Sequence, residues 1–143
     1  MKKIAKRFPL SILTASLLAF AVFLSLSEST QAQIQDVKVI EITAKKYEYS
    51  ASPIHVKSGT KVQLKITATD HDHGFKITAV PDGTVTNGTA GLIFTSPPDC
   101  WQLKKGETTL IEFLAQASGT YTFRCCHTCG VGHRGMKGQI VVD

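Results

Sequence analysis

One short segment, from Arg124 to Met136, contains most of the side chains that could carry out chemistry in this sequence. Its residues, RCCHTCGVGHRGM, include three of the four cysteines, two of the five histidines and the one methionine besides Met1. Thiolate, imidazole and thioether groups gathered so closely are typical of a site for a soft or borderline metal ion. The segment therefore predicts a metal centre.

The spacing of these ligands favours copper. Read in order, the segment is Cys125-x3-Cys129-x3-His133-x2-Met136. A thioether is a soft ligand that suits copper and poorly suits zinc. His73, in the upstream segment DHDHGF, follows an expected strand and supplies a further imidazole from a distant part of the chain.

A zinc site is the first alternative. Cys125, Cys129 and His133, with either Cys126 or His127, make four nitrogen and sulfur ligands of the kind zinc prefers. That assignment leaves His73 and Met136 without a role.

The rest of the domain must position these ligands, and its pattern is all-β. Alternating apolar and polar residues, or β-branched and aromatic runs, predict strands over 37–39, 54–56, 62–66, 109–113, 120–124 and 138–142. Turn residues separate these runs, and no stretch has a convincing helical period. Short strands at this spacing indicate a Greek-key sandwich or barrel.

The first 32 residues read as a targeting segment. A basic stretch over 2–7 precedes an apolar run over 8–26, and small residues stand at Thr30 and Ala32. This is typical of a secretory signal peptide, with an uncleaved membrane anchor as the alternative. We therefore expect a signal over 1–32, an exported domain over 33–143, and a periplasmic or other extracytoplasmic location.

Composition narrows the function of that domain. The chain carries a net charge of +5, but four of its 16 Lys and Arg and one of its 11 Asp and Glu lie in residues 1–32, which leaves +2 for the rest. This charge gives no basis for nucleic-acid binding. The domain shows no nucleophile elbow, catalytic-triad order or phosphate loop, so we expect a binding or electron-transfer module rather than an enzyme on its own.

The cysteine pattern also points to metal ligation. Four cysteines in an exported domain would first suggest two disulfides. However, Cys125, Cys126 and Cys129 lie within five positions, and the adjacent pair could bridge only with strain. At least two of them are better explained as ligands.

The loop, the strands beside it and His73-Gly74-Phe75 together resemble a known family. Residues 121–142 and His73 resemble the CuA domain of haem-copper cytochrome oxidase subunit II and the similar domain of nitrous oxide reductase. The resemblance covers 47–143 in outline. It implies a cupredoxin-like fold and electron transfer with a redox partner such as a c-type cytochrome or a terminal oxidase or reductase.

The resemblance also implies a ligand set for two copper ions. Cys125 and Cys129 would bridge the two ions through their thiolates. His133 and the backbone carbonyl of His127 would complete one copper, and His73 and Met136 would complete the other.

Several features depart from that family. His127 stands where the family commonly has Glu, and Cys126 stands where it usually has no thiol. The interval before Cys125 is long, with an insertion expected within 82–106 that contains Cys100 and Trp101. One hypothesis for the extra cysteine pair is a Cys100–Cys126 disulfide that holds this insertion beside the site; whether the pair is joined stays open at this point. No pair of N-terminal membrane helices of the oxidase type is evident, so we do not expect the oxidase subunit itself.

Two other functions stay open beside the two-copper relay. One is a mononuclear blue-copper protein with His73, one cysteine, His133 and axial Met136. The other is a copper carrier, which the extra donors Cys126 and His127 would favour. For His71 and His55 we expect solvent-exposed positions without a role at the site, and Trp101 is expected to pack in a partly buried position.

Overall fold

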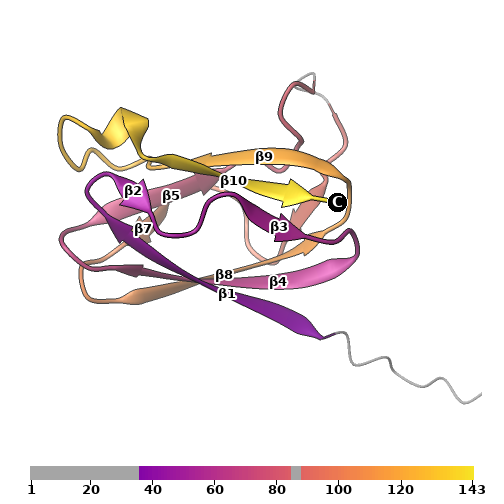
Figure 1. Cartoon of the computed structure of the whole chain (residues 1–143), viewed down its shortest axis with the longest axis horizontal. Helices are drawn as coiled ribbons and strands as arrows, with labels where there is room; N and C mark the ends of the chain where they lie inside the picture. The colour runs from indigo at the N-terminus through magenta and orange to yellow at the C-terminus, as the bar shows by residue number, and fades with distance from the viewer. Residues whose placement is uncertain (1–35, 85–87) are drawn as a thin grey trace, which may run out of the picture. The chain divides into compact units, whose positions relative to one another are not determined.

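Two five-stranded sheets make up the part of the chain that the computed structural model describes, residues 36–84 and 88–143 (Figure 1). The expected signal segment, 1–32, lies outside these residues. One sheet has the order β2-β1-β4-β8-β6 and comprises β1 (Val37–Lys45), β2 (Glu48–Tyr49), β4 (Thr60–Ala68), β6 (Leu92–Phe94) and β8 (Thr108–Ala115). The other has the order β3-β10-β9-β5-β7 and comprises β3 (Ile54–Val56), β5 (His73–Ile77), β7 (Trp101–Leu103), β9 (Gly119–Arg124) and β10 (Lys137–Val142).

The predicted all-β sandwich is confirmed, and each predicted strand is present with longer or equal bounds. Within residues 36–84 and 88–143 the one helical element is a 3-10 turn, η1 (His133–Gly135). No helix in this part of the chain is long and apolar enough to cross a bilayer.

Alternation of side chains along β4 explains how the sheets meet. Val62, Leu64 and Ile66 are buried, whereas their neighbours are exposed or half-buried. Since successive residues of a strand point to opposite faces, one face of β4 supplies the core. In β1, by contrast, the predicted alternating residues Val37 and Val39 are exposed, and burial begins only at Ile42.

The expected insertion within 82–106 forms a strand in each sheet. β6 pairs with β8, and β7 pairs with β5 in the opposite sheet. The chain therefore crosses from one sheet to the other just before Trp101. This crossing places Cys100 beside β5, the strand that begins with His73.

An aromatic cluster packs beneath β5. The rings of Tyr49 and Phe123 meet edge to face at 5.2 Å between centroids, and Phe75 stacks on Phe123 at 5.0 Å. The Tyr49 hydroxyl donates a buried hydrogen bond of 2.6 Å to the Gly74 carbonyl, next to His73. This bond ties β2 of one sheet to β5 of the other.

We expect Tyr49→Phe to destabilise the metal-free protein by about 1–3 kcal/mol, because the buried Gly74 carbonyl loses its partner. Thermal or urea unfolding followed by circular dichroism measures the change. Tyr47→Phe is the matched control, since the Tyr47 side chain is exposed, and its effect should stay within about 0.5 kcal/mol. Equal stability of the two variants would show that the Tyr49 hydroxyl contributes nothing.

Candidate metal centre

The loop over 125–136 joins β9 to β10 at one end of the sandwich, opposite the C-terminus (Figure 1). Its two ends are held together, because Arg124 pairs with Lys137 and the Cys125 N–H donates to the Met136 carbonyl at 2.9 Å. Gly130 has a φ of 123°, a backbone conformation that favours glycine. The loop is therefore a closed turn on a rigid pair of strands.

Two free thiols lie inside this loop. Cys125 and Cys129 are both buried, and their Sγ atoms are 3.5 Å apart. Cys125 Sγ also lies 3.2 Å from the carbonyl oxygen of His127. Burial and the hydrogen bond with Cys125 raise the pKa of the Cys129 thiol to about 11. At neutral pH that thiol is protonated, so a metal that binds it must displace a proton.

The loop and β5 each present an imidazole nitrogen without a partner. Nδ1 of His73 and Nδ1 of His133 are buried and make no hydrogen bond. Nε2 of His73 lies 2.7 Å from Asp70 Oδ1, so Nε2 carries the proton and Nδ1 is left with its lone pair. A buried nitrogen in this state is available to bind a metal ion.

The donor groups fit copper. Met136 is fully buried at the end of the loop that carries the two free thiols, the His127 carbonyl and the unpartnered Nδ1 of His133. Thioether and thiolate ligands with imidazole are the set that copper prefers. Unpartnered buried nitrogens are rare in folded proteins, and bound metal would satisfy those of His73 and His133.

Asp70 is a residue of the site that the sequence reasoning missed. It accepts hydrogen bonds from the backbone N–H groups of Lys46 and His71 as well as from His73. Partial burial acts to raise the pKa of Asp70, but the hydrogen bond from His73 and the two backbone bonds outweigh it and hold that pKa well below its usual range. The signal in the sequence is a carboxylate three residues before a ligand histidine, a partner that orients the imidazole.

We expect the metal-free protein to lose stability as pH falls below about 4, the usual pKa of an aspartate. Because the folded pKa of Asp70 is lowered, its contribution is complete above the unfolded pKa and is lost as pH falls through the folded one. Urea unfolding between about pH 2 and pH 6 measures this slope, and Asp70→Asn should flatten it. An unchanged slope in Asp70→Asn would contradict the assignment.

The expected position of His71 is wrong. Its side chain is 28% exposed rather than solvent-exposed, and Nε2 lies 2.8 Å from the Cys129 carbonyl oxygen. The reason is that His71 precedes β5 in a turn that folds over the ligand loop. His55 behaves as expected, with 61% of its side chain exposed, and Trp101 is partly buried against Phe75 and Phe94.

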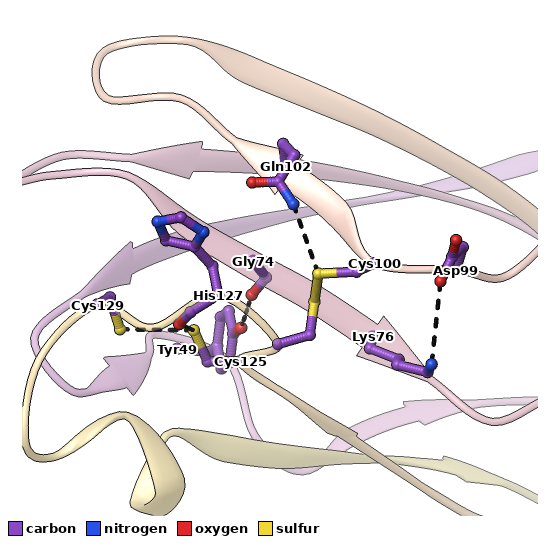
Figure 2. Close-up of a disulfide and its surroundings, with 10 residues drawn as sticks. Tyr49, Gly74, Lys76, Asp99, Cys100, Gln102, Cys125, His127 and Cys129 are labelled. Atoms are coloured by element: carbon purple, nitrogen blue, oxygen red, sulfur yellow. Dashed lines mark hydrogen bonds and ion pairs between the residues drawn. A yellow bond between two sulfur atoms is a disulfide. The ribbon is translucent and has the colours of Figure 1, made fainter.

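The question left open for Cys100 and Cys126 has an answer: the two form a disulfide, which Figure 2 shows beside the ligand loop. It joins the residue before β7 to the residue after Cys125. A β-carbon added at Gly74 would come within 2.7 Å of Cys126 Sγ, so the bridge packs directly on β5. Cys126 is therefore not a metal ligand, which removes one form of the zinc alternative.

His127 presents its backbone rather than its ring to the thiols. In Figure 2 the carbonyl oxygen lies on the side of Cys125 and Cys129, and the imidazole extends away from them. This is the arrangement expected of a carbonyl donor. The ring is half-buried.

Comparison with known proteins agrees with this fold. The description "Cupredoxin-like domain" matches residues 16–142. Cytochrome c oxidase subunit 2 of Thermus thermophilus is 29% identical over 103 residues, which are 72% of this chain and 64% of that protein. The chain thus spans less than two thirds of the length of this relative.

Two solved structures share the fold. The periplasmic domain of cytochrome oxidase subunit II from Bradyrhizobium japonicum has 17% identity and a TM-score of 0.56, over 74% of this chain and 83% of that one. Auracyanin A, a "blue" copper protein from Chloroflexus aurantiacus, also has 17% identity and a TM-score of 0.56, over 76% of this chain and all of that one.

Proposed function

The chain belongs to the cupredoxin-like domain family, a family of copper electron-transfer modules, and from this premise we propose that it is an exported electron-transfer protein with a binuclear, CuA-like copper centre. The observation that carries the proposal is the pair of free, buried thiols of Cys125 and Cys129, 3.5 Å apart. A mononuclear site uses one thiolate and leaves the second unexplained.

Six donors would hold the two ions. The thiolates of Cys125 and Cys129 would be shared by both ions, the imidazole of His133 and the carbonyl of His127 would serve one ion, and the imidazole of His73 and the thioether of Met136 would serve the other. Once bound, the copper pair supplies a one-electron donor and acceptor whose unpaired electron is shared by both metals.

The residues of the chain keep the cost of each electron transfer low. Cys125 and Cys129 are each 7% exposed, and His73 and Met136 are fully buried, so these ligands exclude water from the site. Asp70 holds His73, and the paired ends of β9 and β10 hold the loop. Ligands fixed in this way move little when the charge of the site changes. A ligand set with no open position suits electron relay better than substrate turnover.

The carrier alternative loses part of its support. It relied on Cys126 as an additional soft donor for handing copper over, and Cys126 is bonded to Cys100.

The Cys100–Cys126 disulfide also bears on the location of the protein. Disulfides are typical of an oxidising compartment, and this one supports export to the periplasm or another extracytoplasmic space. There the partner would be a c-type cytochrome or a terminal oxidase or reductase, with no nucleic acid and no contact with the membrane except through an uncleaved N-terminal segment.

Metal analysis with electron paramagnetic resonance tests the proposal. We expect the copper-loaded protein to hold two coppers per chain and to show hyperfine coupling to both nuclei from one electron. One copper with coupling to a single nucleus would replace the proposal by a blue-copper site. A copper that a competing chelator removes quickly would replace it by a carrier.

The ends of the mature protein are part of the same proposal. We propose that residues 1–32 are removed on export and that 33–143 form the working domain. Intact-mass measurement of protein recovered from the periplasm of an expression host tests this, and a mass that includes the first 32 residues would instead assign a membrane anchor.

A further inference from the structure

His71 is the one histidine near the site that the proposed ligand set does not use. Its ring lies 4.2 Å from the ring of His73, measured between centroids. Three possible ligand atoms, one each from His71, His73 and Cys129, all lie within 4.8 Å of one another. Three such donors at this spacing can reach a single metal ion.

The burial of the three residues forms a path inward. His71 is 28% exposed, whereas His73 is fully buried and Cys129 is 7% exposed. The set therefore begins at the surface of the protein and ends on a bridging thiol. An ion from solvent reaches His71 before it reaches His73.

The surroundings of His71 attract a cation. Its Nε2 donates to the Cys129 carbonyl, which leaves the lone pair on Nδ1. Nδ1 is buried, has no hydrogen-bond partner, and lies 2.9 Å from Asp70 Oδ2. A metal ion that binds Nδ1 would lie close to this carboxylate, whose negative charge favours a cation there.

The chemistry of the set fits one copper ion. Two imidazoles and one thiolate are a trigonal donor set that copper favours. We propose that His71, His73 and Cys129 form a transient mononuclear site that captures the first copper ion before the two-copper centre is complete. This inference rests on the proposed function, because it assigns the order in which that centre fills.

The capture step involves no change of oxidation state. Cu(II) forms a bond to Cys129 Sγ, the thiol proton passes to solvent, and the two imidazoles bind through lone pairs. A second ion that enters as Cu(I) would complete the centre, so that the pair shares the one unpaired electron of the captured Cu(II), the Cys125 thiol proton passes to solvent, and His71 is released. The two-copper product therefore does not contain His71.

Rapid mixing of the metal-free protein with one equivalent of Cu(II) tests the proposal. The protein is prepared with the Cys100–Cys126 bridge intact and Cys125 and Cys129 reduced. We expect an early species with a sulfur-to-copper absorption band and coupling to one copper nucleus. In His71→Ala this species should form at least tenfold more slowly. After a second equivalent of copper is added as Cu(I), the final protein of the variant and of the wild type should hold two coppers.

Two further variants separate ligation from other roles of His71. His71→Gln keeps a donor for the Cys129 carbonyl but lacks the imidazole, so it should be as slow as His71→Ala. His55→Ala removes an exposed histidine that pairs with Asp143 and should behave as the wild type. Circular dichroism checks that each variant is folded.

Three results would overturn the capture site. The first is that the wild type forms no early single-copper species. The second is that both His71 variants form it at the wild-type rate. The third is that His71→Gln alone matches the wild type, which would assign His71 a hydrogen-bonding role. A failure of the proposed function gives another result, because the wild type would then end with one copper per chain. The rates at which the early single-copper species forms in the wild type and the His71 variants would still decide the role of His71.

Discussion

Cys129→Ser is expected to abolish the two-copper centre, with at most one copper bound per chain and no hyperfine coupling to a second nucleus. The reason is that the variant lacks one of the two thiolates that we propose to bridge the coppers, at a position where the other thiol lies only 3.5 Å away. A serine hydroxyl is far less acidic than a thiol and is a hard donor that binds copper weakly. Metal analysis and electron paramagnetic resonance of the loaded variant measure both effects.

Met136→Leu is the matched control for this variant. It also removes a buried sulfur, but the thioether is the weak ligand of the proposed set. This variant should keep two coppers and change the reduction potential and the spectrum. Two coppers with an unchanged spectrum in Cys129→Ser would show that the thiolates do not bridge.

Removal of the disulfide is expected to cause the largest loss of stability. In Cys100→Ala/Cys126→Ala, a bridge across 26 residues of sequence is lost, which corresponds to about 3–4 kcal/mol from the entropy of the unfolded chain. For a domain of this size the melting temperature should fall by on the order of 10 °C. Thermal unfolding of the metal-free protein measures the change.

The double variant should also release copper faster to a chelator. Cys126 separates Cys125 from the His127 carbonyl, and the bridge holds this segment against β5. Gln102→Ala is the control, since it removes an amide 3.6 Å from Cys100 Sγ and leaves the bridge in place. If the double variant melts with the wild type, the bridge does not support the domain.

The sequence was sufficient to predict the sandwich and most of the loop. Val62, Leu64 and Ile66 alternate with polar residues, and a strand of this pattern has one buried face in almost any sheet. The spacing of Cys125, Cys129, His133 and Met136 is local, so all four lie on or beside the one loop that joins β9 to β10. The Cys100–Cys126 bridge was one hypothesis that the sequence left open, and the crossing of the chain before β7 is what brings these two cysteines together.

The contacts that sequence reasoning missed depend on chain crossings. Tyr49 reaches Gly74 from the opposite sheet, and Asp70 binds both His73 and the Lys46 backbone. His71 was expected in solvent because no local pattern reveals that its turn folds onto the Cys129 carbonyl. The exposure of Val37 and Val39 was missed for the same reason. An alternating pattern shows which residues share one face of a strand, but it does not show whether another part of the chain packs on that face.

The pairing of the cysteines affects how long the metal-free protein keeps its ability to bind copper. Four cysteines can join into two disulfides in three ways, and each of them consumes Cys125 and Cys129. Only the half-oxidised protein, with Cys100 joined to Cys126, keeps both thiols. Because those thiols already lie 3.5 Å apart, an oxidant can join them with little movement of the loop. Copper and oxidant therefore compete for the same two sulfur atoms. How long the metal-free protein keeps its ability to bind copper depends on the rate of this oxidation relative to the rate of copper binding.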